Sequence, residues 1–403
     1  EGSEIDARLS GTMAEVLKLI DMKPLGYPSR YGVETKNAAG SAALDLKFSV
    51  PLRHDLHVAD VGISVKATTE GLGLALGPHM RLTDGKIVFV VDNDHLRASG
   101  TTGLGGSASR LAVDWNEDFR SGPKVTTRIA VKGALDDKAR ASLDLGTDGY
   151  LKGQMGVTGT LTGRRGGLAE GAFTLDLTPA AVTVDLAGIS KPSGFPMNGR
   201  LALRFGAHSH PSEMNLRISG RGAAATVAAG FAADGTLSAL SVPSLRFGGK
   251  DDFSLTLMRG AAGTEISVNG RSLDGSRIFR QSAGAAAGGE SGKSGKSMFD
   301  GPWRVVVALD RLMLHEGVSA ADFRLDLSGI GDRPADFRLS GSLGKKGAMT
   351  GGIVRTEAGR DLHLTVEDAG RFFKGLYGFS GMHGGKLRSE EHTSELQSLS
   401  RIS

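Results

Sequence analysis

The sequence predicts a mainly β protein built on a long, curved antiparallel β-sheet, with a few short α-helices. Apolar and polar residues alternate along many segments, as in ALDLKFSV over Ala43–Val50, and this alternation is typical of strands with one apolar and one polar face. The chain has 60 glycines among 403 residues, and glycine, aspartate and asparagine separate the segments, which indicates turns. We therefore expect strand to follow strand, in a sheet large enough that it must curve.

Each alternating segment places its apolar residues on one side of a predicted strand, so that the strands together would present one apolar, inward-facing surface. The residues predicted to face inward are Leu44, Leu46, Phe48, Val61, Ile63, Val65, Phe173, Leu175, Leu177, Val182, Val184, Leu201, Leu203, Phe205, Met214, Leu216, Ile218, Phe253, Leu255, Leu257, Val305, Val307, Leu309, Phe323, Leu325 and Leu327. Their polar neighbours in sequence are expected to keep the opposite face in water.

Turns and a first helix are marked by local sequence signals. The segments TDGK at Thr83–Lys86 and AADGT at Ala232–Thr236 are predicted turns between strands. A helix is predicted after Gly11, because Thr12 and Glu15 have the spacing of a capping box and an apolar stripe follows them. Pro24 is expected to end this helix.

Two further helices are expected later in the chain. One is predicted within Asp136–Leu145, and the other begins near Glu367 and has Phe372, Phe373 and Leu376 on one side. Glycines close to the last helix are expected to keep it short.

A stretch rich in glycine, serine and alanine divides the predicted strands into two parts. Residues 281–297 show no apolar period and are predicted to form a flexible linker. The expected organisation is a β-groove segment with two helices over 1–280, the linker, a continuation of the groove with one helix over 298–387, and a tail over 388–403.

Composition and charge exclude several classes of function. The formal net charge is +4, and the basic residues are spread along the chain instead of forming the clusters with aromatic residues that are typical of nucleic-acid binding. The chain has no cysteine, so it has neither a thiolate metal site nor a cysteine nucleophile. No apolar run approaches the length of a membrane-spanning helix.

No motif points to catalysis, a cofactor or a metal. The segment GESGKSGKS over 289–297 lacks the spacing of a phosphate-binding loop, because Ala287 and Glu290 stand where its first glycine would be needed. We therefore predict a protein that is not an enzyme and uses no cofactor.

The histidines form only short local pairs. His54 and His57 flank an aspartate, and His208 and His210 precede a proline. A zinc site needs three or four convergent ligands, so these histidines are expected to lie at the surface and no metal site is predicted.

The apolar face allows two interpretations. It could pack into an ordinary closed core, or it could form an open trough lined by aliphatic side chains. A trough would suit lipid acyl chains, whose transfer from water is favourable by about 0.8 kcal/mol per CH₂ group. Composition alone favours the closed core.

Several segments, taken in order, resemble one known family. They are LIDMKPLGYPSRYGVE (Leu19–Glu34), LTDGKIVFVVDNDHLRASGTTGLGG followed by LAVDWNEDF, GAFTLDLTPAAVTVDLAGISKPSG (Gly171–Gly194), LRFGGKDDFSLTLMR, and VEDAGRFFKGLYGFSGMHGGKL. The ordered run is similar to the YhdP-type branch of the AsmA-like superfamily and covers residues 2–387. Ile189 departs from the pattern, because an aromatic residue is expected before the Lys-Pro turn.

The resemblance implies a fold, a location and a function. Proteins of this branch are anchored in the inner membrane of Gram-negative bacteria and extend through the periplasm. They form a twisted, bridge-like β-groove with an apolar interior and are implicated in moving phospholipid towards the outer membrane. The expected partners are therefore phospholipid acyl chains, the membrane through an anchor outside this chain, and envelope proteins. The inward-facing residues named above would line the lipid groove, with no catalytic residues.

Two other functions remain open. A structural or interaction β-protein of envelope assembly would have a filled core and no lipid path. An enzyme would require a pocket with convergent polar groups and perturbed carboxylates.

The C-terminal tail resembles translated adapter DNA. The residues RSEEHTSELQS over Arg388–Ser398 are identical to the in-frame translation of a common sequencing adapter. We therefore expect residues 388–403 to be an artefactual, disordered tail on an internal fragment of a longer protein.

Overall fold

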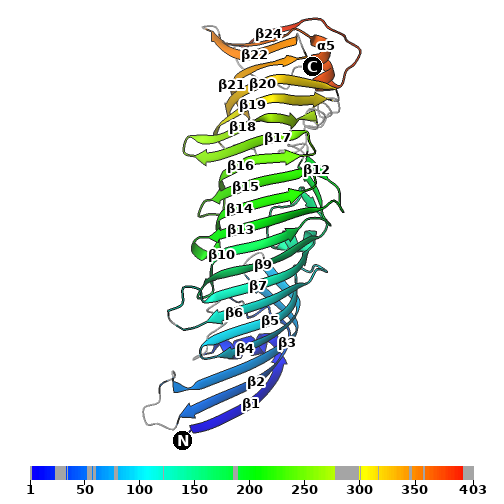
Figure 1. Cartoon of the computed structure of the whole chain (residues 1–403). Helices are drawn as coiled ribbons and strands as arrows, with labels where there is room; N and C mark the ends of the chain where they lie inside the picture. Colours follow the sequence, from blue (N-terminus) through cyan, green and yellow to red (C-terminus); the bar gives the residue numbers. More distant parts are fainter. Residues whose placement is uncertain are drawn as a thin grey trace. The chain divides into compact units, whose positions relative to one another are not determined.

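The computed structural model describes residues 2–22, 33, 35–51, 57, 60–76, 80–120, 122–184, 189–276, 299, 301–315, 317–344, 347–356 and 359–393. Over these residues the mainly β prediction is confirmed, because most of the chain forms strands (Figure 1). Twenty-one strands belong to a main sheet and three to a small one. The chain divides into two compact units, residues 1–182 with 191–212 and residues 183–190 with 213–403. Each unit is described by itself.

The first unit contains ten strands of the main sheet, each paired antiparallel with the next. They are β1 (Gly2–Thr12), β2 (Ala39–Pro51), β3 (Gly62–Leu76), β4 (Met80–Asp92), β5 (His95–Leu104), β6 (Leu111–Asp118), β7 (Thr127–Leu135), β9 (Met155–Arg164), β10 (Gly167–Asp176) and β13 (Met197–Phe205). Helices α1 (Met13–Asp21) and α3 (Asp137–Ser142) interrupt them. The small sheet consists of β8 (Leu151–Lys152), β11 (Ala181–Val184) and β12 (Ile189–Lys191).

Eleven strands of the main sheet follow in the sequence, together with one helix. They are β14 (Pro211–Gly220), β15 (Ala223–Phe231), β16 (Leu237–Phe247), β17 (Asp251–Gly260), β18 (Gly263–Asp274), β19 (Pro302–His315), β20 (Val318–Ile330), β21 (Arg333–Leu343), β22 (Gly347–Thr356), β23 (Gly359–Val366) and β24 (Leu387–Thr393). Helix α5 (Ala369–Tyr377) lies between the last two strands. A short 3-10 helix, η3 (Ala207–Ser209), precedes β14.

One pairing in the second unit departs from the antiparallel prediction. Strands β18 and β19 run parallel, from Thr264 opposite Trp303 to Asp274 opposite Met313. The linker expected over 281–297 lies outside the described residues, but the strands on both sides of it pair with each other inside one unit. The two compact units divide near residue 212, and the predicted linker at 281–297 stays a prediction.

The three α-helices of the described residues occur where the sequence predicts them. At α1 the Thr12 hydroxyl accepts a hydrogen bond from the Glu15 backbone N–H, and the Glu15 carboxylate accepts one from the Thr12 N–H, which completes the capping box. Asp136 caps α3 and Asp368 caps α5 in the same manner, each accepting from the N–H three residues later. Gly378 ends α5 in the left-handed conformation.

Each unit has its own buried apolar cluster. In the first unit Met13, Val16 and Leu17 of α1 pack on strand residues that include Leu44 and Leu72. The helix thus covers part of the apolar face of the neighbouring strands.

In the second unit Phe372 of α5 packs in a cluster with Leu309, Leu314 and Leu343. Gly375 allows this close approach, because a Cβ atom there would lie 3.0 Å from a Leu314 side-chain carbon. Both helices therefore bury one side on the apolar face of the strands.

Helix α3 buries a charged residue that the sequence pattern does not reveal. Arg140 is almost fully buried and donates to the carbonyl oxygens of Leu135, Leu151 and Gly153, at 3.0, 2.9 and 2.6 Å, and it also contacts the Asp137 carboxylate. Because every buried polar group needs a partner, this arginine fixes the chain around α3 to the end of β7.

Some glycines have a role other than the turns that the sequence predicts. Gly159 on β9 is the direct cross-strand partner of Phe173, and Gly171 lies two residues before Phe173 on β10. A Cβ atom would come within 2.2 Å of the Phe173 ring at Gly159 and within 2.9 Å of it at Gly171. Glycine thus makes room for a large neighbour across the ladder.

The predicted turn at Thr83–Lys86 is wrong, because this segment forms a bulge inside β4, where Asp84 has a φ angle of 55°. The turn at Ala232–Thr236 is confirmed.

The disorder expected for the tail is wrong for its first six residues. Residues 388–393 belong to β24, which pairs antiparallel with β23 from Val366–Leu387 to Arg360–Thr393. Ladder hydrogen bonds join backbone groups, so an edge strand can accept a segment without an apolar pattern. Residues 394–403 lie outside the described residues.

Candidate functional site

The first unit carries a row of apolar residues that crosses all ten of its main-sheet strands. Each residue in the row is the direct cross-strand partner of the next, so all of their side chains stand on one face. The row is Leu9, Leu44, Ala67, Phe89, Ala98, Trp115, Ile129, Leu161, Gly171 and Leu203. The register therefore converts ten separate alternating segments into one apolar face.

The second unit carries a comparable row over eight consecutive strands, from β16 to β23. It consists of Val242, Leu255, Val268, Val307, Leu325, Leu339, Gly351 and Leu364. The row continues unbroken across the parallel pairing, where Val268 lies opposite Val307. The six leucine and valine residues from Leu255 to Leu364 are only half-buried. The described chain therefore leaves part of this apolar face open.

None of the residues predicted to face inward is exposed. Leu44, Leu46, Val65, Leu175, Leu177, Phe253, Leu309 and Phe323 are buried, and the others are half-buried. Val182 and Val184 differ from the other residues of the set, because they lie on β11 of the small sheet and not on the main sheet. Their alternation matches a strand, but it does not reveal which sheet the strand joins.

Part of the face was not predicted from the sequence. Phe89, Trp115, Ile129 and Leu161 belong to the row of the first unit but not to the set predicted to face inward, and only around Phe89 is the alternation interrupted. In IVFVV over Ile87–Val91, apolar residues occupy both faces, and Val90 is 41 % exposed. Cross-strand register, and not the local pattern, assigns these residues to the apolar face.

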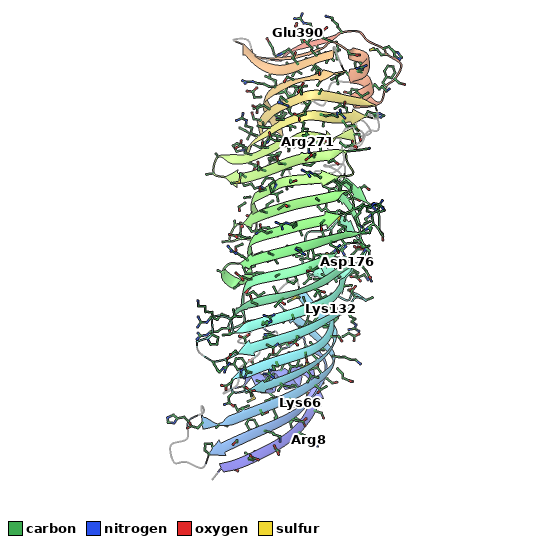
Figure 2. All side chains as sticks on the ribbon, viewed as in Figure 1. Arg8, Lys66, Lys132, Asp176, Arg271 and Glu390 are labelled. Carbon is green, nitrogen blue, oxygen red and sulfur yellow. The ribbon has the colours of Figure 1, made fainter. Side chains whose placement is uncertain are left out.

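The opposite face is polar and charged. Arg8 pairs with Asp45 at 3.3 Å, and Arg304 pairs with Asp326 at 2.7 Å, both between neighbouring strands. The Arg304 guanidinium lowers the pKa of the Asp326 carboxyl by donating hydrogen bonds to it. Figure 2 labels basic and acidic side chains from both units, among them Lys66, Lys132 and Asp176.

Within the described residues no group of three or more histidine, aspartate or glutamate side chains could hold a metal ion. His57 and His210 are exposed, while His54 lies outside the part of the chain that is described. No described helix has the length and apolarity needed to cross a bilayer.

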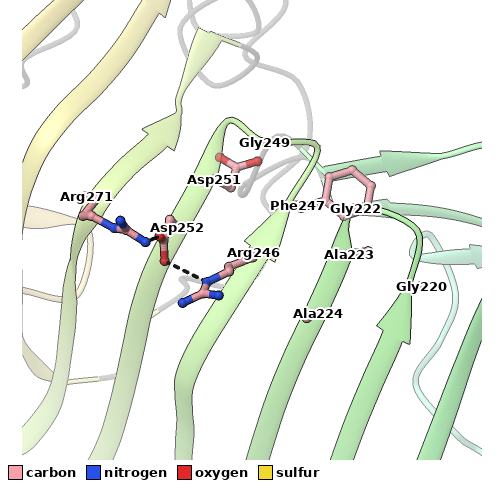
Figure 3. A pocket seen from close by; sticks show the side chains of 10 residues that line it. All are labelled: Gly220, Gly222, Ala223, Ala224, Arg246, Phe247, Gly249, Asp251, Asp252 and Arg271. Atoms are coloured by element: carbon pink, nitrogen blue, oxygen red, sulfur yellow. Dashed lines mark hydrogen bonds and ion pairs between the residues drawn. The ribbon is translucent and has the colours of Figure 1, made fainter.

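A pocket of about 460 Å³ lies at the β16–β17 hairpin of the second unit (Figure 3). Its walls include Arg246 and Phe247 on β16, Asp251 and Asp252 on β17, and Arg271 on β18. Glycines and alanines from β14, β15 and the turns complete it. The segment LRFGGKDDFSLTLMR contains Arg246, Phe247, Asp251 and Asp252, but its pattern does not reveal that they meet Arg271 of β18, because a bulge between Asp252 and Phe253 sets that register.

Comparison of the chain with protein families, curated proteins and solved structures finds no match. The resemblance to the AsmA-like superfamily therefore stays a prediction.

Proposed function

We propose that this chain is a segment of a periplasmic bridge, anchored in the inner membrane by another part of the protein, whose apolar face carries phospholipids between the inner and outer membranes. The row of half-buried aliphatic residues from Leu255 to Leu364 carries the proposal. It supplies apolar surface that the described chain does not fully cover, on a face without charged groups in that row. Acyl chains would gain about 0.8 kcal/mol for each CH₂ group that the face removes from water.

The register supports transfer along the row, from each strand to the next, as well as binding at one place. Neighbouring strands lie about 4.8 Å apart, so eight strands offer equivalent aliphatic positions at regular short steps. An acyl chain would find similar surroundings at each step, and no single position would hold it strongly. Such a surface suits movement better than storage.

One observation favours the alternative of a structural or interaction protein of the envelope. Helices α1 and α5 cover the face next to them and form fully buried clusters with it, as an ordinary core would. In this alternative the half-buried residues would be covered by a protein partner and not by lipid.

The test measures phospholipid that co-purifies with the chain from the periplasm of a Gram-negative host, using mass spectrometry without detergent. Leu255→Asp puts a charge on the apolar face, and Thr256→Asp puts the same charge on the exposed face of the same strand. We expect the lipid to be lost in Leu255→Asp and kept in Thr256→Asp, because burying a carboxylate against acyl chains is costly.

A matched pair in the first unit repeats the comparison. Leu203→Asp changes the apolar face and Ala202→Asp the exposed face of β13. Circular dichroism checks that all four variants fold. Absence of phospholipid from the unmodified chain, or equal lipid content in both members of each pair, would reject the proposal in favour of the structural alternative.

A further inference from the structure

The charged residues of the pocket at the β16–β17 hairpin form one connected group. Asp252 lies between two arginines, with Arg246 Nε 3.6 Å from its Oδ1 atom and the Arg271 guanidinium in contact with Oδ2 (Figure 3). Both guanidinium groups contact the same carboxylate, which cannot accept hydrogen bonds from all of their N–H donors. The two arginine side chains are 65 % and 72 % exposed, so their remaining donors are free to meet a ligand.

The neighbouring residues leave room beside these donors. Cross-strand register places Ala224 next to Arg246 and Arg246 next to Asp252 on one face of three strands. A methyl group is all that Ala224 contributes, and Gly220, Gly222 and Gly249 add no side chain to the wall. Within the described part of the chain, the space next to the guanidinium groups is therefore open.

The other carboxylates near the pocket do not cancel this positive charge. Asp251 is 4 % exposed and accepts a hydrogen bond from the Asp274 backbone N–H at 2.8 Å. Burial raises the pKa of the Asp251 carboxyl, because the charged form loses its hydration there. Asp274 in turn forms an ion pair with Lys250, whose ammonium lies 3.7 Å away. The group most available to a ligand is the arginine pair.

The pocket also joins the two faces of the sheet. Phe247 and Ala223 are direct cross-strand partners, and they stand on the same face as Leu245, which belongs to the apolar side of β16. Arg246 stands on the opposite, charged face between Leu245 and Phe247. A ligand at this hairpin could thus touch an aromatic ring and two guanidinium groups together.

We infer that this pocket binds the phosphate group of a phosphate ester through Arg246 and Arg271, with the apolar part of the ester against Phe247. Arginine presents a planar set of donors that matches two phosphate oxygens, and this makes it well suited to phosphate. The inference rests on the proposed function for its last step, which is that the ester is a phospholipid whose acyl chains lie on the apolar face.

The experiment titrates the full chain with four probes by calorimetry. Inorganic phosphate and glycerol 3-phosphate carry the phosphate without acyl chains, dihexanoyl phosphatidic acid carries both, and dihexanoylglycerol carries the acyl chains alone. Arg246→Gln and Arg271→Gln remove one donor group each. Arg217→Gln is the matched control, because Arg217 is exposed on the polar face of β14 and does not line the pocket.

We expect Arg246→Gln and Arg271→Gln each to weaken binding of glycerol 3-phosphate and phosphatidic acid about tenfold, equal to about 1.4 kcal/mol. Binding of dihexanoylglycerol should not change. Asp252→Asn should strengthen phosphate binding severalfold, because it frees both guanidinium groups and removes a negative charge. Arg217→Gln should match the unmodified chain.

Unchanged phosphate affinity in both pocket variants, an equal loss in Arg217→Gln, or weaker binding in Asp252→Asn would overturn the inference. The outcomes separate it from the proposed function. If glycerol 3-phosphate binding depends on Arg246 but neither dihexanoyl probe responds to Leu255→Asp, the phosphate site stands and the lipid-carrying face fails. If phosphatidic acid binding depends on Leu255 but not on either arginine, the lipid-carrying face stands and the phosphate site fails.

Discussion

Two aspartates show how local surroundings shift the pKa of the same kind of side chain in opposite directions. Burial is the main cause of the raised pKa of Asp251, because the carboxylate loses its hydration and gains a hydrogen bond from only one backbone N–H. At Asp118 the Arg120 side chain and backbone N–H donate hydrogen bonds to the carboxylate and lower its pKa to about 2. Neither shift follows from the sequence, because burial and the choice of partners depend on the folded backbone.

The Asp251 shift predicts a pH dependence of stability. Between the ordinary pKa of 3.8 and the raised value, the folded chain binds more protons than the unfolded chain, so this group destabilises the fold increasingly as pH rises through that window. Asp251→Asn keeps an acceptor for the Asp274 N–H and cannot ionise. We expect it to raise the urea midpoint at pH 7 and to have a smaller effect below pH 3.8, measured by circular dichroism. An equal change at both pH values would contradict the role of ionisation.

At the scale of the elements, helix α5 is held by its apolar side. Phe372 is buried in the second cluster and Phe373 packs against that cluster, whereas Tyr377, five residues after Phe372, is 56 % exposed. The hydrophobic effect therefore stabilises the helix mainly through the side that meets β19 and β20.

Phe372→Ala should destabilise the second unit by about 3–5 kcal/mol, the usual cost of deleting a buried aromatic side chain. Tyr377→Ala should change stability by less than about 0.5 kcal/mol, because its ring is largely solvated. Urea denaturation measures both, and hydrogen exchange of the α5 amides shows whether the helix detaches. Similar costs for the two variants would mean that α5 is held by contacts other than Phe372.

The elements themselves could be predicted well because their causes are local. The capping box at Thr12 and Glu15 needs only residues three positions apart, and the inward set from Leu44 to Leu327 needs only strict alternation. The bulge at Asp84 could not be distinguished from a turn, since both use an Asp-Gly pair. The glycines next to Phe173 could be explained only once register placed them beside its ring.

The site was predictable to a similar extent. Alternation identified the apolar face in separate strands, but the rows that join these strands depend on register. Val182 and Val184 show the limit, because a correct strand pattern says nothing about which sheet receives the strand. The pocket of Arg246, Asp252 and Arg271 was beyond prediction, since its residues lie on three strands and meet through a bulge.

At the scale of the whole molecule, the main-sheet strands of each unit pair with their neighbours in sequence order, and one pair, β18 with β19, is parallel where the others are antiparallel. Antiparallel and parallel neighbours have the same alternation of side chains, so the pattern could not predict that β18 and β19 run parallel. A parallel pair requires a long connection, and residues 275–301 provide one. The segment that looked like a boundary between two parts instead connects two adjacent strands.

The last strand has a consequence for how the molecule meets copies of itself. Strand β24 covers β23, whose Leu362, Leu364 and Val366 would otherwise stand on an unpaired edge. Its own sequence, LRSEEHT, is polar and charged, and charged edge strands resist pairing with another chain. Removing residues 388–403 should therefore promote edge-to-edge self-association, seen as a rising mass with concentration in light scattering after size-exclusion chromatography. A chain shortened only by residues 394–403 should behave like the full chain, and two equally monodisperse truncations would show that β24 has no such protective role.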